Sequence, residues 1–435
     1  MKTLIYNAVL TDSASTRHSW VLFDRTGILQ SGTGEPAPCT LGWADETVNA
    51  EGASVIPGLA DTHVHFRQPG MEHKGDMLTE GRAAVAGGVT TVFDMPNTRP
   101  ATTTVEALEE KRMLAAASGA PCRIIPLLGV VPGAMKDLRK LDPASTPAVK
   151  MFLGTSTGAM TSPAGKELED VFRFLADTRI PLIVHAEDND IIARNMADAV
   201  ARYGSAEDVP VSMHSVIRSR EACLRSSAAA VELAHRFGTR LHIAHVSTAD
   251  EVRELLAPGP TASKLVTAET TPLYLDPVLC HAEARTCRHK VNPAIKTEAD
   301  ATALREALAS GAIDTIGTDH APHLLSEKEL PGMTAMSGAP SVQFALPMML
   351  TYLPLGLIVD KMTAGPRTIF DIDTPAEFTP GSRADIVIIR ETPEYTIADS
   401  DAVSRCAWTP FAGRTLRHKV IATYVGGARV YTAAE

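Results

Sequence analysis

The sequence has no run of about 18 consecutive apolar residues, the length that a helix needs to cross a bilayer. Its beginning, Met-Lys-Thr-Leu-Ile-Tyr-Asn, turns polar too soon for a secretion signal. The 435-residue chain also lacks an excess of basic residues, because its formal net charge is −10. We therefore expect no membrane span, no signal peptide, and neither nucleic acid nor a membrane as partner.

The six cysteines include no C-x-x-C pair. Scattered cysteines fit reduced thiols in the cytoplasm better than a disulfide framework or a cysteine-bound zinc site. The sequence contains no low-complexity tract and no repeat of fixed period. With 45% hydrophobic and 21% charged residues, the composition is typical of a soluble globular protein, which we expect in the cytoplasm.

Both ends of the chain carry short strand-like segments. Strands are predicted at residues 3–10, 20–29 and 46–53, and again at 384–390, 420–424 and 428–432. Gly426-Gly427 marks a hairpin turn between the last two. The chain is too long for one ordinary core. We therefore expect residues 1–55 and 375–435 to form one composite β-sandwich domain.

The middle of the chain, residues 56–374, has a different rhythm. Apolar strand-like runs lie at residues 54–59, 89–95, 123–130, 148–153, 181–184, 240–244, 264–268 and 313–317. Helical patterns separate most of them, most clearly at 297–310, with Thr297 as a capping residue and Gly311 after its end. Eight strands alternating with helices predict an α/β fold, a (β/α)8 TIM barrel.

His63 and His65 follow the first of these strands. Since side chains alternate along an extended chain, the two imidazoles project to the same side. Such a pair is a natural half of a divalent metal site. Taken alone, an H-x-H motif equally describes two ordinary core or surface histidines.

Polar residues recur along other predicted strands and at their ends, where a barrel of this kind carries its catalytic groups. They are Lys150 in the fourth strand, His185 after the fifth, His245 after the sixth and Asp319 after the eighth. Each has an ordinary interpretation: a lysine can extend to water, a histidine can be a hydrogen-bonded core residue, and an aspartate can cap a helix. Chance explains poorly why all of them fall on one face.

On these motifs the chain resembles the dihydroorotases, in the cyclic-amidohydrolase branch of the amidohydrolase superfamily. The resemblance covers nearly the whole chain, up to residues 408–413. It implies that His63, His65, His185, His245 and Asp319 are metal ligands. It also implies that Lys150 is carboxylated by CO2 and bridges two metal ions. Imidazole and carboxylate ligands suit Zn²⁺, so we expect two zinc ions per subunit, with Asp319 also transferring a proton.

The resemblance further implies the reversible, metal-dependent cyclisation of N-carbamoyl-L-aspartate to L-dihydroorotate in pyrimidine synthesis. Arg67 matches a carboxylate-binding arginine, Asn97 and His323 match two further carboxylate contacts, and Asn292 matches a ring-binding asparagine. From the sequence alone, both asparagines equally fit turns beside proline. We also expect a homo-oligomer, a dimer or a tetramer.

Three departures and two alternatives remain at this point. Gln68 stands where many relatives carry Glu or Asp, and residues 293–296 and 270–273 also differ from the commoner motifs. Residues 154–158 predict a loop over the site, whose Thr155, Ser156 or Thr157 could contact substrate. The alternatives are an allantoinase- or hydantoinase-like cyclic amidohydrolase and a catalytically silent barrel that serves as a scaffold.

Overall fold

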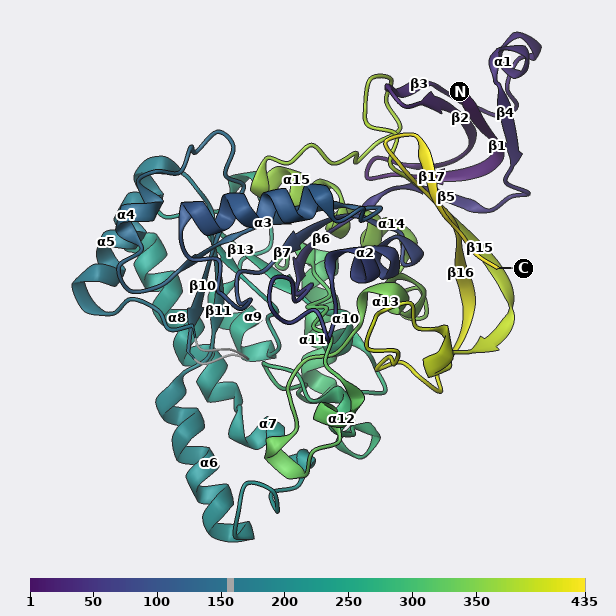
Figure 1. The fold of residues 1–435 in the computed structure, drawn as a ribbon. Coiled ribbons are helices and arrows are strands. Elements are labelled where there is room, and N and C mark those ends of the chain that lie inside the picture. Colours follow the sequence, from purple (N-terminus) through teal and green to yellow (C-terminus); the bar gives the residue numbers. More distant parts are fainter. Residues whose placement is uncertain (155–159, 435) are drawn as a thin grey trace.

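The protein is described by a computed structural model, which covers residues 1–154 and 160–434. Figure 1 shows a sheet built from both ends of the chain on one side of the molecule, beside a larger region of parallel strands and helices. Within these residues, no helix is long and apolar enough to cross a membrane.

The first sheet joins the two ends of the chain. Its strands are β1 (Thr3–Thr11), β2 (Thr16–Asp24), β3 (Gly27–Thr33), β4 (Glu46–Asn49), β5 (Ser54–Pro57), β15 (Ile386–Thr396), β16 (Thr415–Val425) and β17 (Ala428–Thr432). They pair in the order β17-β16-β15-β5-β1-β2-β3, and β4 pairs with β1. A hydrophobic cluster of its own, including Phe23, Val55 and Ile386, fills this region. That cluster supports the predicted domain boundaries near residues 55 and 375, which stay a prediction.

The barrel strands follow one another in chain order. They are β6 (Leu59–Val64), β7 (Val89–Asp94), β8 (Arg123–Pro126), β9 (Leu128–Val130), β10 (Val149–Leu153), β11 (Leu182–Ala186), β12 (Leu241–Ile243), β13 (Val266–Thr270) and β14 (Thr315–Ile316). Neighbours pair in parallel from β6 to β8 and from β9 to β14. β8 and β9 are two halves of the strand predicted at 123–130. A parallel bridge between Val64 and His320 joins the first strand to the chain after the last, so the predicted barrel is present.

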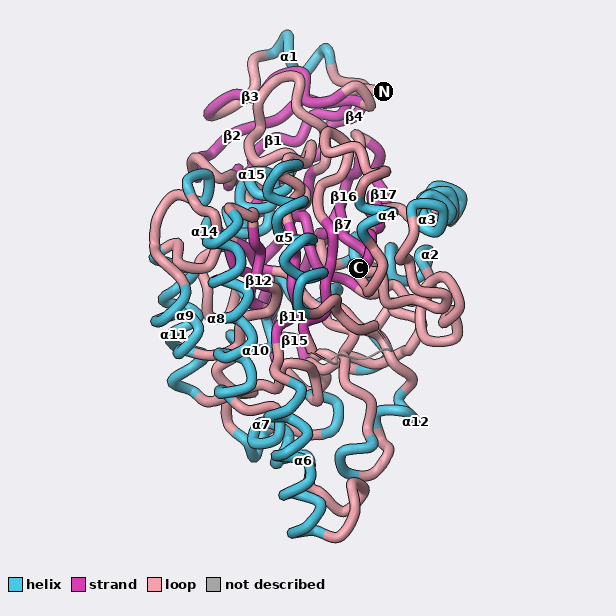
Figure 2. Tube along the Cα trace, turned by 90° about the vertical axis from the view of Figure 1, so that its left-hand side faces the viewer, coloured by secondary structure: helices cyan, strands magenta, loops and turns pink. Residues whose placement is uncertain are grey.

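Most helices lie around these strands, whereas α1 (Pro38–Trp43) lies at the sheet of both chain ends (Figures 1 and 2). The other helices are α2 (Met77–Ala86), α3 (Val105–Ala117), α4 (Met135–Leu138), α5 (Gly165–Thr178), α6 (Asn189–Tyr203), α7 (His214–Ile217), α8 (Arg220–Phe237), α9 (Ala249–Leu255), α10 (Pro272–Leu275), α11 (Glu298–Ser310), α12 (Leu325–Lys328), α13 (Val342–Met349), α14 (Leu355–Met362) and α15 (Ala364–Phe370). α11 confirms the predicted helix, with a capping box between Thr297 and Asp300 and a left-handed Gly311 at its end.

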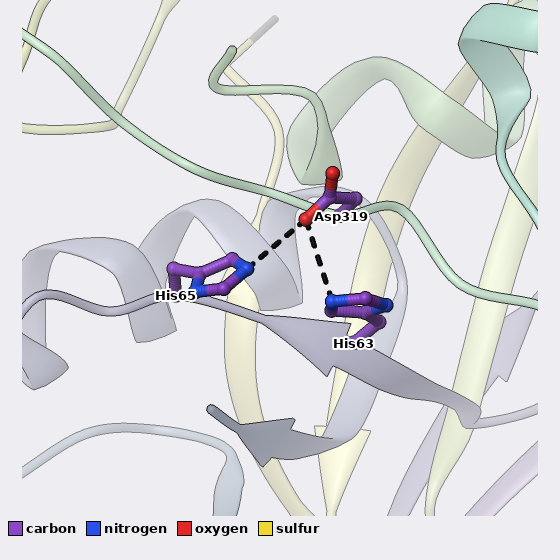
Figure 3. A group of neighbouring side chains, drawn as sticks. All are labelled: His63, His65 and Asp319. Carbon is purple, nitrogen blue, oxygen red and sulfur yellow. Dashed lines mark hydrogen bonds and ion pairs between the residues drawn. The ribbon is translucent and has the colours of Figure 1, made fainter. Parts of the chain in front are cut away.

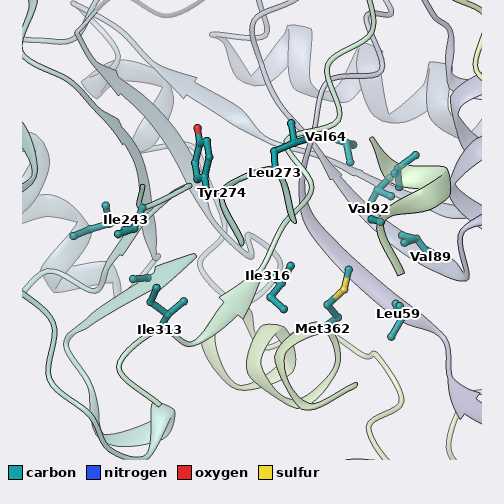
Figure 4. Close-up of a cluster of buried hydrophobic side chains, with 14 of the residues drawn as sticks. Leu59, Val64, Val89, Val92, Ile243, Leu273, Tyr274, Ile313, Ile316 and Met362 are labelled. Atoms are coloured by element: carbon teal, nitrogen blue, oxygen red, sulfur yellow. The ribbon is translucent and has the colours of Figure 1, made fainter. Parts of the chain in front are cut away.

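The main core lies between the barrel strands and this helical layer. Figure 4 shows part of it, formed by Leu59, Val64, Val89, Val92, Ile243, Leu273, Tyr274, Ile313, Ile316 and Met362. Val64 belongs to this core, and its neighbours His63 and His65 are turned toward Asp319. The alternation along β6 therefore separates packing residues from the candidate ligands.

The strand predicted at 54–59 is present only in part and is not one barrel strand, because the chain changes sheet at Gly58. β5 pairs with β1 and β15, whereas β6 starts at Leu59 and carries His63 itself. The Gly58 N–H donates to Asp385 O over 2.8 Å. A Cβ at this position would meet Thr90 Cγ2 at 2.6 Å and Asp385 Cβ at 2.8 Å. Only glycine allows the two sheets to approach so closely here.

The predicted strand at 20–29 is extended at both ends but is not continuous, because a turn divides it into β2 and β3. The Asp24 carboxylate accepts a hydrogen bond from the Thr26 N–H at 2.7 Å, which closes the turn. Gly27 follows with a φ of 133°. The hairpin predicted at Gly426-Gly427 is confirmed between β16 and β17.

Candidate metal centre and adjoining cavity

His63, His65 and Asp319 converge where β6 and β14 end (Figure 3). Asp319 Oδ1 lies 3.1 Å from His65 Nε2 and 3.5 Å from His63 Nε2. One ligand atom from each residue lies within 4.8 Å of the others. Two imidazole nitrogens and a carboxylate oxygen at this spacing are a donor set that a divalent ion such as Zn²⁺ accepts.

A second pair of histidines adjoins this group. His185 lies on β11 and His245 follows β12, with 3.0 Å between His185 Nδ1 and His245 Nε2. The His245 ring also stacks on His63, with 5.1 Å between the ring centroids. Burial lowers the pKa of both His185 and His245, so each imidazole is neutral and can offer a lone pair. The structure thus brings together the four predicted histidines.

Lys150 lies fully buried in β10. Among the residues the structure describes, its Nζ has no hydrogen-bond partner. Burial lowers the pKa of the Lys150 ammonium to about 8, against the opposing charges of Glu269 and Asp319. Its own charge in turn acts on His185 and Asp319, so it lies within electrostatic reach of both groups. A buried, unpaired nitrogen there fits a side chain whose coordination is completed by another group.

Three of the site residues have left-handed backbone conformations. The φ angles are 68° at Arg67, 41° at His245 and 48° at Asp319. Such angles cost residues other than glycine about 1–3 kcal/mol and persist only where the surroundings enforce them. The surrounding structure therefore holds these three side chains in the site at a cost in conformational free energy. The local sequence does not predict these backbone angles.

Glu269 at the end of β13 is a site residue that our sequence analysis missed. Its Oε1 accepts a hydrogen bond from His63 Nδ1 at 2.9 Å, and its Oε2 accepts one from Thr62 Oγ1 at 2.5 Å. Burial opposes ionisation, yet the nearby His242 imidazole, 3.9 Å away, and the hydrogen bond from His63 hold the pKa of Glu269 well below its usual range. With its Nδ1 proton so engaged, His63 turns Nε2 toward Asp319. The strand-end argument applied to the other strands would also have found Glu269.

Asn97, predicted as a substrate contact, also orients a candidate ligand. Its Oδ1 lies 2.7 Å from His65 Nδ1, which we assign as the donor because His65 Nε2 faces Asp319. Asn97 therefore connects the histidine cluster to the cavity that it lines.

That cavity measures about 480 Å³ and contains Arg67, Asn97 and His323 in its wall. Arg67 is 3% exposed, and its Nε donates to Pro322 O at 2.9 Å. Its Nη2 lies 3.0 Å from His323 Nε2. Burial lowers the pKa of Arg67 to about 10, so the side chain keeps its charge at neutral pH. A buried guanidinium beside an open cavity suits an anionic ligand.

Two other predictions have different outcomes. Asn292 is not among the described residues that line this cavity, and its Oδ1 accepts a hydrogen bond from His214 Nε2 at 3.2 Å. Thr155, Ser156 and Thr157 lie outside the described residues.

Gln68 gains an explanation, because its Oε1 accepts a hydrogen bond from the Met77 N–H at 3.1 Å, at the first residue of α2. An amide oxygen fills this capping role without the charge of Glu or Asp.

Fold and site together define a (β/α)8 barrel with a candidate metal centre at the carboxyl ends of its strands. The chain belongs to the amidohydrolase family, whose sequence profile matches residues 54–430.

Individual relatives agree with this assignment. The chain is 35% identical to a dihydroorotase of Halobacterium salinarum over 364 residues, which cover 82% of each protein. It is 32% identical to a dihydroorotase of Staphylococcus epidermidis over 402 residues, 89% of each. Among solved structures it is similar to an L-hydantoinase (dihydropyrimidinase) of Arthrobacter aurescens, with a TM-score of 0.89 and 26% identity over 100% of this chain and 96% of the other. The predicted TIM-barrel fold is thereby confirmed.

Proposed function

We propose that the chain is a metal-dependent dihydroorotase, which interconverts L-dihydroorotate and N-carbamoyl-L-aspartate. The observation that carries this proposal is the position of Arg67 and His323 in one cavity, which Asn97 joins to His65. Dihydroorotate carries a carboxylate on its ring, and a buried guanidinium is the fixed cation that such a group requires. The curated relatives named dihydroorotase support the same function.

We also propose that two Zn²⁺ ions bind per subunit, held by His63, His65, His185, His245, Asp319 and carboxylated Lys150. The neutral amine of Lys150 would attack CO2, forming an N–C bond and releasing one proton, which leaves an anionic carbamate. The lowered pKa of Lys150 and the lack of a hydrogen-bond partner for its Nζ among the described residues support this step. When bound, the metal ions would acidify a water molecule and polarise the amide carbonyl.

The chain's own residues bind the substrate and move the proton. Arg67, His323 and Asn97 would hold the ring carboxylate and so fix which amide carbonyl faces the metal centre. Asp319 would take the proton of the attacking water and deliver it to the departing amide nitrogen. In the biosynthetic direction the same groups act in reverse order.

Because the chain is similar to the Arthrobacter aurescens hydantoinase, a hydantoinase-like cyclic amidohydrolase is the second candidate function. Rates on dihydroorotate, allantoin and dihydrouracil, measured on one zinc-analysed sample, separate the two. We expect the highest kcat/KM on dihydroorotate. A preference for a ring without a carboxylate would favour the hydantoinase-like function. A stable, metal-free protein without turnover would favour the scaffold.

Replacing Arg67 tests the carboxylate site directly. Arg67→Met removes the charge, so we expect kcat/KM on dihydroorotate to fall roughly 100-fold, about 2.7 kcal/mol of transition-state binding. The zinc content should stay that of the unmodified protein, since the hydrogen bonds of Arg67 go to Pro322 and His323. Arg67→Lys keeps a positive charge, so its kcat/KM on dihydroorotate should fall less than that of Arg67→Met. Unchanged kinetics in Arg67→Met would exclude the carboxylate role.

The expectations about partners and location belong to the same proposal. We propose a homo-oligomer, a dimer or a tetramer, located in the cytoplasm, that acts on a small molecule and binds neither nucleic acid nor membranes. The negative net charge of −10 supports the last point. Light scattering during size-exclusion chromatography measures the oligomeric state.

A further inference from the structure

Lys74 is a buried lysine that the proposed reaction does not use. It lies between β6 and α2, where its N–H donates to Met71 O at 3.0 Å. The residue is 8% exposed and lines the same cavity as Arg67 and His323. Its Nζ lies 2.7 Å from Glu327 Oε1 and 3.2 Å from His323 Nδ1. The ammonium therefore stands behind His323, on the side away from Arg67.

His323 lies between two side chains that can only donate. Arg67 approaches its Nε2 at 3.0 Å and Lys74 approaches its Nδ1 at 3.2 Å. A guanidinium and an ammonium have no acceptor atom, and a neutral imidazole has one acceptor nitrogen. Burial and the charges of Arg67 and Lys74 hold the pKa of His323 well below its usual range, so the ring is neutral. It can therefore accept a hydrogen bond from only one of its two neighbours.

Two tautomers of His323 are possible in this setting. In one, Nε2 accepts from Arg67 and Nδ1–H faces Glu327 Oε2, 3.4 Å away. In the other, Nδ1 accepts from Lys74 and Nε2 carries the proton. The second tautomer leaves Nε2–H and the Arg67 guanidinium as two donors that meet beside the cavity. An acceptor shared by both, such as a carboxylate oxygen, would stabilise that arrangement.

We propose that Lys74, held by Glu327, is a positioning residue that fixes His323 as the Nε2–H tautomer and so turns it into a second donor for the substrate carboxylate beside Arg67. The Glu327 carboxylate is itself placed by a hydrogen bond from the Leu324 N–H to its Oε2 at 3.0 Å. Oε1 is thereby left to Lys74. This inference rests on the proposed function for the identity of the ligand, but the tautomer is a property of the protein alone.

Nitrogen-15 NMR of histidine-labelled protein reads the tautomer directly, because protonated and unprotonated ring nitrogens resonate far apart. The His323 signals are assigned by their loss in His323→Gln. We expect an unprotonated Nδ1 in the unmodified protein and a protonated Nδ1, facing Glu327, in Lys74→Met. A protonated Nδ1 in the unmodified protein, or the same tautomer in both, would overturn the proposal.

Kinetics on dihydroorotate give the second readout. Lys74→Met should raise KM about tenfold, the effect of one misdirected hydrogen bond to a charged group, with kcat changed less than twofold. Lys74→Arg keeps a donor at this place and should recover most of the loss. Glu327→Gln keeps one of the two acceptor oxygens. Its KM should therefore lie between those of Lys74→Arg and Lys74→Met. Equal losses in kcat for Lys74→Met and Lys74→Arg would assign Lys74 a merely structural role.

Failure of this inference and failure of the proposed function are distinguishable. If the unmodified, zinc-loaded protein does not turn over dihydroorotate, the proposed function fails, whereas the NMR experiment still decides the tautomer. If the unmodified protein is active and Lys74→Met leaves both the spectrum and KM unchanged, the role of Lys74 alone is wrong.

Discussion

At the scale of single residues, the site depends on partners that fix which nitrogen of each histidine faces inward. Glu269 engages His63 Nδ1 and Asn97 engages His65 Nδ1, so both Nε2 atoms face Asp319. The sequence could predict the histidines because they follow apolar strands. It could not predict these pairings, because Glu269 is 206 positions away from His63 and their contact depends on closure of the barrel.

Glu269→Gln tests this orienting role. The amide removes the negative charge that favours the Nδ1–H tautomer of His63, so we expect zinc affinity to fall about 10- to 100-fold. Competition with a chromogenic chelator measures the affinity. Thr62→Val is the matched control, because it removes the other hydrogen bond to Glu269 without touching His63. Equal affinities in Glu269→Gln and the unmodified protein would contradict the orienting role.

At the scale of elements, sequence patterns predicted helices and hairpins well and the points where a strand ends or changes sheet poorly. The capped helix at 297–310 and the hairpin at Gly426-Gly427 carry their signals locally. The break at Gly58 has no such local signal. An apolar run has the same sequence pattern whether it pairs in one sheet or passes from one sheet to another. The reason for the break is steric and lies in Thr90 and Asp385, which are far along the chain. Strand ends that depend on tertiary contacts are therefore hidden from the sequence.

The short helix α12 leads to a prediction about pH. Lys328 Nζ donates to Lys290 O at 2.9 Å and to Met336 O at 2.7 Å, and the residue is fully buried. Burial, with the charge of Lys290, lowers the pKa of Lys328 to about 7 from 10.5. Between these two values the unfolded chain binds more protons than the folded one, so the free energy of unfolding should rise with pH.

From pH 7 to 9 this contribution is at most about 2.7 kcal/mol. Below pH 7 both states are protonated and the contribution is constant. Urea unfolding across this range should therefore show a smaller rise for Lys328→Met than for the unmodified protein. Lys166→Met, at an exposed lysine on α5, serves as the control and should keep the full rise. The same pH dependence in both variants would show that Lys328 titrates normally.

At the scale of the whole molecule, one short connection links the sheet of both chain ends to the barrel. β5 ends at Pro57 in the first sheet, and β6 starts at Leu59 in the second, with Gly58 between them. Because β6 carries His63 and leads to His65 and Arg67, the position of this connection sets where the metal centre and cavity begin. The sheet of both chain ends thus contributes to the site without lining it.

Gly58→Ala tests whether this close approach holds the two sheets in place. The added methyl group would contact Thr90 Oγ1 and Cγ2 and Asp385 Cβ, so we expect a loss of about 1–3 kcal/mol in stability, as for other overpacked sites. Gly42→Ala is the control, since nothing lies within 4 Å of its added methyl. In the double variant with Thr90→Ala, part of the loss should return, because two of the three contacts disappear while Asp385 remains. Denaturation followed by circular dichroism measures all four proteins. If Gly58→Ala were as stable as Gly42→Ala, the sheets would have to separate freely at this point, and the position of β6 would need another explanation.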